Sequence, residues 1–379
     1  MRMKRAIALA CLLMVLSAGC AGKVASGRAG EPAVTAQAEA AVACTEAPDR
    51  TASPATPEPT ATPALTPEPT PEPYGDTIDY HRLAPLYEEV YSAEEIALAH
   101  EVVDAFLRGE TAVTLKTPMR RIEMDDVQVL LRVMCPPFSG LCNVTLSKNY
   151  AKSVSAFTWE YRYDAERTEA ELAGFEEEVR GYLALLKKGD GEAVRALAIY
   201  LKFARATEYD DQLAENDAGG MTEQESSLRS SPYYTILYHT GVCYCYAQAL
   251  TFLYAQAGLE AGVANCWDGE TAGAHAWTLV KLDGHYYYAD ATWEHDAEFY
   301  GTLYFGMTAE DRYQYGGGYA AADTEFCYTP ILDHVELTDT RFAALHGAYY
   351  QYITAYEVDH QSGQIVFTFV DGSRQAVTP

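Results

Sequence analysis

The sequence predicts an acidic globular protein in which several helices precede an antiparallel hairpin. The 379 residues are 49% hydrophobic and 12% aromatic, which allows a sizeable core and excludes collagen-like, coiled-coil and fully disordered chains. Apolar residues recur at helical spacing in several segments of the chain. Asp283-Gly284 then separates two runs rich in β-branched and aromatic residues, which is a strong signal for a hairpin turn.

The charge of the chain excludes partners that require a basic surface. It has 54 acidic against 27 basic residues and a formal net charge of −27. Phosphate backbones and anionic lipid headgroups are bound by clusters of Lys and Arg. We therefore expect no nucleic-acid partner and no adsorption to membranes through charge.

The N-terminus resembles a bacterial export signal. Basic residues precede the apolar run Ala6–Leu16, which is too short to span a bilayer permanently. The run ends in Leu-Ser-Ala-Gly-Cys20, which resembles a lipobox except that Ser17 stands where Leu is usual. We expect residues 1–19 to be removed and Cys20 to be lipidated, anchoring the protein at the cell surface, on the outer face of the bacterial cytoplasmic membrane. The alternative is an ordinary secretory signal cleaved near Ala21.

A stalk is expected between the signal and the first ordered element. Eight prolines lie between Pro54 and Pro73, interleaved with Thr, Glu and Ala and without apolar periodicity. Such a segment cannot bury enough surface to offset its ordering entropy, and proline biases it to an extended chain. We therefore predict that residues 20–75 are disordered and that order begins near Tyr80.

An N-terminal α/β region is predicted over residues 76–190. Its first helix has a plausible N-cap in Ser92, with Glu95 completing a capping box. Pro136-Pro137 is expected to stop the second helix, because proline lacks the N–H that a helix interior requires. The elements expected here are helices at Glu94–Arg108, Met124–Met134 and Thr168–Lys188, the last opened by Thr168, and a strand at Val154–Tyr163.

The core is expected over residues 191–332. A helix at Glu192–Ala206 and a polar loop, Asp211–Ser231, precede Thr240–Gly258, where apolar residues recur at intervals of four, three and four residues. This spacing predicts a helix with Cys243 at its start, where unpaired N–H groups and partial positive charge stabilise a thiolate or an oxyanion. A cysteine in an apolar helix, taken alone, is more often a buried and inert thiol.

The predicted hairpin places a histidine near an aspartate. If Asp283-Gly284 is a two-residue turn, His275 lies opposite Thr292. Asp290 is then one diagonal step from His275 on the same face, within reach of a His–carboxylate hydrogen bond. A loop that is longer by one residue would place the two side chains on opposite faces.

Cysteine, histidine and aspartate together meet the needs of a thiol nucleophile, because the imidazole accepts the thiol proton and the carboxylate orients the imidazole. From Glu192 to Phe305 the chain resembles the bacterial transglutaminase-like superfamily in four motifs: Gly-Val-Cys, His-Ala-Trp, Lys-Leu-Asp-Gly-His-Tyr and Asp-Ala-Thr-Trp. The family's catalytic residues fall on Cys243, His275 and Asp290. The resemblance implies a papain-like α+β fold, in which the helix carrying the Cys packs on an antiparallel sheet carrying the His and Asp.

One position departs from the family pattern. Cys245 stands where the family usually has a small residue, often Gly. Two residues span about 200° of a helix, so Cys243 and Cys245 cannot both face His275. We expect Cys243 to be the nucleophile, and Cys245 is the alternative if the helix begins later.

The other cysteines and acidic residues give weaker signals. Cys135 and Cys142 flank a Pro-Pro-Phe-Ser-Gly turn and are the one pair of cysteines whose proximity is indicated locally. Glu294, Asp296 and Glu298 form an acidic cluster without a calcium-loop pattern, which we interpret as a solvated turn. Because the Cys and His residues also lack paired zinc spacing, we expect no metal and no cofactor.

The C-terminal part of the chain is aromatic and then rich in β-formers. Turn signals at Ser362-Gly363 and Asp371-Gly372 predict that residues 333–379 form a small β appendage, such as a hairpin added to the main sheet. Before it, a Tyr-rich stretch either lines a substrate groove or packs surface loops. Its tyrosines include Tyr304, Tyr313, Tyr315 and Tyr319.

The resemblance implies cysteine-dependent chemistry on amide bonds. Members of this fold transfer acyl groups to amines, hydrolyse peptide bonds, remove glycans from Asn or have lost catalysis. We therefore expect a surface-anchored hydrolase or acyltransferase that acts on protein or peptide through a thioester acyl-enzyme. The alternative is a non-catalytic module that binds peptide or glycan at the cell surface. A peptidase of the Cys-His-His type is disfavoured by Asp290 in the third position, and the oligomeric state is left open.

Overall fold

The computed structural model describes residues 71–146, 152–215, 221–267, 274–294, 299–315, 330–347, 350 and 352–379. The predicted signal peptide, the lipidation site Cys20 and the predicted stalk as far as residue 70 lie outside the described residues. Within the described ranges, no helix is both long and apolar enough to cross a lipid bilayer.

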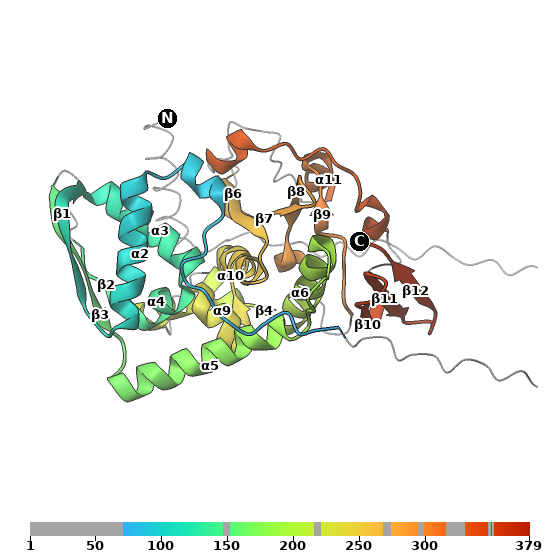
Figure 1. Cartoon of the computed structure of the whole chain (residues 1–379), viewed down its shortest axis with the longest axis horizontal. Helices are drawn as coiled ribbons and strands as arrows, with labels where there is room; N and C mark the ends of the chain where they lie inside the picture. The colour runs from blue at the N-terminus through green and yellow to red at the C-terminus, as the bar shows by residue number, and fades with distance from the viewer. Residues whose placement is uncertain are drawn as a thin grey trace, which may run out of the picture. The chain divides into compact units, whose positions relative to one another are not determined.

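Helices and a small sheet form the N-terminal region (Figure 1). Helix α2 (Ala93–Leu107) packs on α3 (Arg121–Met134), and the sheet beside them has the strand order β1-β3-β2. The other elements of this region are η1 (Pro85–Glu89), β1 (Ala112–Arg120), α4 (Pro136–Leu141), β2 (Cys142–Val144), β3 (Ser153–Tyr161) and α5 (Ala165–Leu183).

Local chemistry sets the ends of these helices. The predicted capping box begins α2: the Glu95 N–H donates to Ser92 Oγ, and the Ser92 N–H donates to the Glu95 carboxylate. Helix α3 ends before the proline pair as expected, but Pro136 begins α4, because a first helical turn does not use the missing N–H. Helix α5 begins earlier than predicted, since Asp164 rather than Thr168 caps it.

Residues 72–74, which we expected within the stalk, pair with the loop after α5. The Tyr74 N–H donates to the Leu186 carbonyl at 3.3 Å, and the Lys188 N–H donates to the Glu72 carbonyl at 2.9 Å. Lys188 Nζ also lies 2.8 Å from the Glu72 carboxylate. The ordered chain therefore includes residues before Tyr80, because this extended segment pairs with a loop and Tyr74 packs against the core.

A single buried helix organises the core. Helix α10 (Cys243–Gln256) lies between a sheet on one side and α5 and α9 (Pro232–Tyr238) on the other (Figure 1). All of its residues except Ala255 are buried, which is typical of a helix that is packed on every face. The helix stops before Gly258, as predicted, because the chain turns there with a φ angle of +71°, which glycine adopts without strain.

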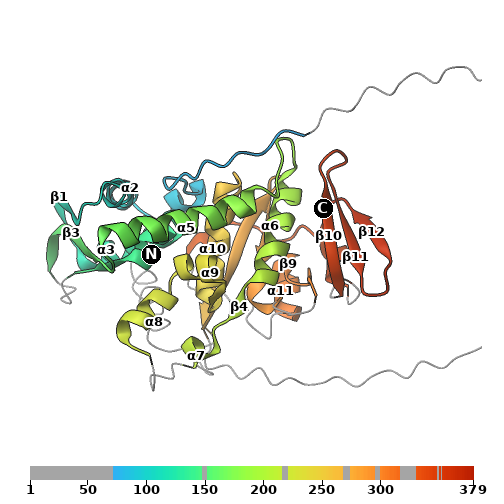
Figure 2. The same cartoon turned by 90° about the horizontal axis from the view of Figure 1, so that it is seen from below.

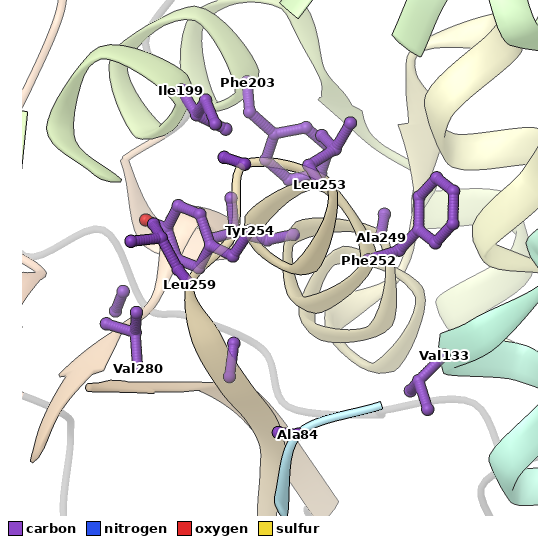
Figure 3. Packing of buried hydrophobic residues seen from close by; sticks show 14 of the residues in the cluster. Ala84, Val133, Ile199, Phe203, Ala249, Phe252, Leu253, Tyr254, Leu259 and Val280 are labelled. Atoms are coloured by element: carbon purple, nitrogen blue, oxygen red, sulfur yellow. The ribbon is translucent and has the colours of Figure 1, made fainter. Parts of the chain in front are cut away.

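The sheet against α10 is antiparallel, with the strand order β6-β7-β8-β9. Its strands are β6 (Glu260–Trp267), β7 (Ala274–Leu282), β8 (His285–Ala289) and β9 (Phe305–Met307). Helix α6 (Glu192–Ala206) also contacts α10. Figure 3 shows residues from α6, α10 and β7 in one buried cluster, among them Phe203, Leu253, Tyr254 and Val280.

The segment predicted as a polar loop, Asp211–Ser231, instead contains short helices. They are α7 (Asp211–Ala214) and α8 (Glu223–Arg229), and α9 follows directly. Asp210, Thr222 and Ser231 cap the three helices through their side chains. Helices this short have too few turns to show apolar periodicity, so only their caps could have indicated them.

The C-terminal strands form a sheet of their own, β10-β11-β12, beside α6 (Figure 2). The predicted hairpin and its Ser362-Gly363 turn are present, but the expectation that it extends the main sheet was wrong. The Tyr356 hydroxyl donates to the Ala198 carbonyl of α6 at 3.3 Å. The elements after β9 are α11 (Ala309–Tyr315), η3 (Pro330–His334), η4 (Ala343–His346), β10 (Ile353–Asp359), β11 (Gln364–Phe369) and β12 (Arg374–Val377).

Candidate active site

Cys243 is the first residue of α10. The chain reaches it through β5 (Thr240–Gly241), which pairs in parallel with β4 (Glu208–Tyr209), the short strand after α6. The N-cap residue Val242 offers no side-chain hydrogen bond to the first turn, so the partial positive charge of the helix start is not neutralised by a capping carboxylate. The Cys243 side chain is 1% exposed.

Cys245 lies on a different side of the helix. Its Cβ is close to Gly241, and a side chain at Gly241 would collide with Thr235 of α9. Burial raises the pKa of the Cys245 thiol, and the Arg132 guanidinium offsets this only in part. The thiolate of Cys245 is therefore disfavoured, and its neighbours are those of α9 and α3.

The structure brings His275 and Asp290 together. His275 Nε2 lies 2.7 Å from Asp290 Oδ2, and both residues are buried. The predicted register holds from Leu282–His285 to Thr278–Ala289, with positive φ angles at Asp283 and Gly284. This confirms the two-residue turn on which the predicted proximity depended.

The expected pairing of His275 with Thr292 does not occur, because the ladder ends at Ala289. Asp290 instead caps the 3₁₀-helix η2 (Ala291–Trp293), and its Oδ1 accepts the Thr292 N–H at 3.2 Å. The carboxylate therefore meets His275 as the cap of a tight turn, not as a diagonal neighbour on a strand.

The first turn of α10 lies at the same end of the fold as this pair. Ala276, next to His275, packs with Tyr244 and Ala247 of α10, and the Thr278 hydroxyl donates to the Ala247 carbonyl at 3.2 Å. Since Asp290 bonds to Nε2 of the imidazole, Nδ1 is the ring nitrogen that can accept a thiol proton.

A buried arginine that the sequence did not predict completes the site. Arg312 of α11 is 0% exposed, and its Nη2 lies 3.1 Å from Asp290 Oδ2. Its guanidinium carbon lies 4.3 Å from the ring centroid of Trp277 and 4.7 Å from that of Trp293. Cation–π contacts of this kind contribute about 2 kcal/mol when desolvated. The one signal in the sequence was the tryptophan in the His-Ala-Trp and Asp-Ala-Thr-Trp motifs.

These neighbours determine the ionisation of the pair. Burial lowers the pKa of His275; Asp290 raises it and Arg312 lowers it again, so that the pKa stays below the ordinary value. Burial alone would raise the pKa of Asp290, but the charges of His275 and Arg312 outweigh it and hold that pKa below the usual range. At neutral pH the site therefore contains a carboxylate and a neutral imidazole.

A second carboxyl group is buried beside the site. Glu294 is 4% exposed, and its Oε1 accepts the Tyr304 N–H at 2.6 Å. Burial raises the pKa of Glu294 to about 8; the Tyr304 N–H opposes this rise and Asp290 adds to it. The interpretation of Glu294 as part of a solvated turn was wrong, because the chain around Tyr304 covers it. Asp296 and Glu298 lie outside the described residues.

The Tyr-rich stretch is described only in part. Tyr304 is partly buried and packs edge-on against Trp293, with ring centroids 5.4 Å apart. The side chains of Tyr313 and Tyr315 and all of Tyr319 lie outside the described part of the chain. In the ranges that are described, no group of three or more His, Cys, Asp or Glu residues is arranged to hold a metal ion.

Cys135 and Cys142 are free buried thiols on either side of α4. Burial raises the pKa of Cys135 to about 12. A cavity of about 580 Å³ opens near Cys142, between α3, α4 and α8, and none of the candidate catalytic residues lines it. Its lining includes Gln128, Arg132, Ser139, Asn143, Gln224 and Ser230.

Comparison with known proteins identifies the core. Residues 183–291 match the model of the transglutaminase-like superfamily, so the chain contains the transglutaminase-like core that its motifs predict. With α10 packed on an antiparallel sheet, the predicted α+β fold with a helix-borne cysteine is confirmed. No curated protein matches the sequence at a significant level.

Solved structures with similarity to this chain include a candidate cysteine protease from Cytophaga hutchinsonii, with 15% identity and a TM-score of 0.23, covering 37% of this chain and 51% of that one. A TGase has 15% identity and a TM-score of 0.26, covering 48% and 50%. A candidate protease from Parabacteroides distasonis has 13% identity and a TM-score of 0.23, covering 38% and 29%. The chain thus spans about half the length, or less, of these proteins.

Proposed function

We propose that this protein is a cysteine-dependent enzyme of the cell surface that acts on amide bonds of proteins or peptides, as a hydrolase or an acyltransferase. The observation that carries the proposal is the buried contact between His275 Nε2 and Asp290 Oδ2 at 2.7 Å, at the same end of the fold as Cys243. The transglutaminase-like match over residues 183–291 supports the assignment of the three roles.

The reaction would follow from these positions. His275 Nδ1 accepts the Cys243 proton, and Sγ attacks the substrate carbonyl to form a tetrahedral oxyanion, which the N–H groups at the start of α10 stabilise. The imidazolium then returns the proton to the leaving amine, and the C–N bond breaks to leave a thioester. Water or an amine attacks the thioester, His275 takes the proton of that nucleophile, and Cys243 leaves to be reprotonated.

The proposed location depends on the N-terminus. The export signal and the lipobox-like Leu-Ser-Ala-Gly-Cys20 support attachment to the outer face of the bacterial cytoplasmic membrane through a lipid on Cys20. The proline-rich segment that follows would hold the folded domain away from the bilayer. Changing Cys20 to Ala should release the protein from the membrane fraction, and a native protein that is already freely soluble would contradict this anchoring.

A non-catalytic module that binds peptide or glycan is the second candidate function. It is favoured by the burial of Cys243, which is 1% exposed, because a nucleophile must be reached by its substrate. The two candidates differ in whether turnover depends on the thiol.

The test is to incubate the full chain with a peptide library, with and without a primary amine, and to follow products by mass spectrometry. Cleaved peptides indicate a hydrolase, and amine adducts at the peptides' amide groups, with loss of ammonia, indicate a transferase. Either product should disappear with Cys243→Ala and persist with the matched variant Cys245→Ala. Retention of peptides by both variants without any product would support the binding module.

A further inference from the structure

Arg312 is held in place by the structure around it. Helix α11 begins with a reciprocal cap: the Thr308 N–H donates to Asp311 Oδ2 at 2.9 Å, and the Asp311 N–H donates to Thr308 Oγ1 at 3.0 Å. His346, in η4, also approaches this first turn: its Nδ1 lies 3.9 Å from Asp311 Oδ1. The next residue along, Arg312, therefore starts from a fixed backbone and extends between two tryptophan rings.

The guanidinium and the imidazole use the same carboxylate oxygen. Asp290 Oδ2 lies 2.7 Å from His275 Nε2 and 3.1 Å from Arg312 Nη2. The other oxygen, Oδ1, accepts the Thr292 N–H, and the Tyr200 hydroxyl donates to the Asp290 backbone carbonyl at 3.2 Å. Asp290 is thus fixed on all sides, and the negative charge on Oδ2 is shared between two cation-forming groups.

Arg312 is an unusual residue to bury for stability alone. Within the described part of the chain, none of its Nε, Nη1 and Nη2 atoms makes an aligned hydrogen bond. Among the described residues, the ion pair with Asp290 and the faces of Trp277 and Trp293 compensate its charge. A buried guanidinium with unmet donors is costly, so its position calls for an electrostatic explanation.

We propose that Arg312 is a positioning residue of the active site: by balancing the charge of Asp290 it keeps His275 neutral in the resting protein. This rests on the proposed function. With Arg312 present, Asp290 and the guanidinium cancel, so the imidazole is free to act as a base. Without Arg312, a buried carboxylate would face the imidazole alone and hold a proton on it.

Other ionisable groups near the pair do not replace this contribution. Glu294 is mostly protonated at neutral pH, since burial raises its pKa to about 8. The pKa of Tyr200 is raised well above its ordinary value by burial, and Tyr304 is shifted in the same direction. Among the described residues, the charged or titratable groups that act on His275 and Asp290 or lie beside them are Arg312, Glu294, Tyr200 and Tyr304, with Cys243 at the same end of the fold.

The experiment measures the ionisation of His275 directly, in full-chain protein carrying Cys243→Ala so that the thiol does not titrate. The nine histidines are labelled with ¹³C and ¹⁵N, His275 is assigned by its loss in His275→Ala, and its NMR signals are followed against pH. Adding Arg312→Met should move the titration midpoint of His275 to higher pH. Adding Arg312→Lys, which keeps the charge, should leave the midpoint close to that of the parent.

A matched control is Glu294→Gln, a neutral substitution beside the same pair. Because Glu294 is mostly protonated below pH 7, this substitution should leave the titration midpoint of His275 unchanged. An unchanged midpoint with Arg312→Met, in protein with native near-UV circular dichroism, would overturn the proposal. If Arg312→Met does not fold, Arg312→Gln supplies the neutral variant, and a midpoint equal to that of Arg312→Lys would overturn the proposal in the same way.

A second readout separates this proposal from the proposed function. In protein that retains Cys243, Arg312→Met should shift the pH dependence of thiol labelling, whereas a purely structural role would lower the rate equally at every pH. The NMR midpoint requires no turnover, so it tests Arg312 even in a protein without activity. Conversely, the peptide-library assay on the unaltered chain tests only the proposed function.

Discussion

Two carboxyl groups are buried side by side at the candidate site and have opposite ionisation. Asp290 lies between His275 and Arg312, and its pKa is held below the usual range despite burial. In the described part of the chain, the hydrogen-bond partners of Glu294 are N–H and hydroxyl donors, and burial, with a smaller effect of the Asp290 charge, raises its pKa to about 8. The comparison shows that the partners of a buried carboxyl, more than burial itself, decide whether it carries charge.

The largest expected effect concerns the thiol and its base. Cys243→Ala should abolish reaction with an amide-mimicking electrophile, and His275→Ala should slow it by about 10²–10⁴-fold, the usual contribution of a general base. Asp290→Asn should be less severe than His275→Ala, because it disturbs the orientation of the imidazole without removing it. Labelling rates at pH 7 check all three, and a rate for His275→Ala equal to that of the unaltered protein would contradict the assignment.

The next largest effect is on stability at the charged carboxyl. Asp290→Asn leaves the buried Arg312 guanidinium without a partner, which should cost about 3–5 kcal/mol of unfolding free energy at pH 7. The measurement is urea denaturation. Glu294→Gln is the matched control, since it replaces a carboxyl that is already neutral, and its cost should be below about 1 kcal/mol. An equal loss of unfolding free energy in Asp290→Asn and Glu294→Gln would contradict the difference in charge between the two carboxyl groups.

The pH dependence of stability should also separate the two groups. The pKa of Glu294 is raised from 4.5 to about 8, so the folded state binds the proton more tightly than the unfolded state. Protonated Glu294 therefore adds to the free energy of unfolding in full below pH 4.5, and this stabilisation is lost as pH rises to about 8. Glu294→Gln should therefore gain stability relative to the unaltered protein over this window.

Asp290 should act in the opposite direction. Its pKa is depressed from 3.8 in the folded protein. Ionised Asp290 therefore stabilises the fold above pH 3.8, and this stabilisation is lost as pH falls through the pKa of the folded state. Denaturation midpoints of the unaltered protein and both variants across pH 3–9 test the pair. A difference between the unaltered protein and Glu294→Gln that stays constant from pH 4.5 to 8 would refute the raised pKa of Glu294.

The smallest effect is expected at Cys245. Its thiol packs beside Gly241 and Thr235 and has a raised pKa because of burial. Cys245→Gly introduces the residue that the transglutaminase-like family often has at this position. The variant should retain activity within about an order of magnitude if the side chain of Cys245 serves only in packing. Loss of activity comparable to that of Cys243→Ala would make Cys245 the nucleophile.

The sequence predicts the parts of the site that local rules govern. The capping box of Ser92 and Glu95, the Asp283-Gly284 turn and the helix that begins at Cys243 depend on residues within a few positions of one another. The turn alone placed Asp290 near His275, although the actual contact uses a 3₁₀ cap rather than a continued strand.

The other half of the site depends on packing between distant segments. Arg312 reaches Asp290 from a helix of one to two turns after β9, and Glu294 is covered by the chain that returns at Tyr304. No periodicity or spacing relates these residues to the hairpin. The separate C-terminal sheet was missed for the same reason, because strand patterns indicate that strands exist but not which neighbours they choose.

Cys243 is the residue that we propose as the activated thiol of this site. The most direct test is to react the unaltered full chain with a substoichiometric amide-mimicking electrophile across pH 5–9 and to identify the labelled residue by peptide mass spectrometry. We expect the label on Cys243, and we expect the labelling rate to rise at a lower pH than for an ordinary thiol, whose pKa is about 8.5. A label on Cys245, or equal and ordinary reactivity of both cysteines, would contradict the proposal.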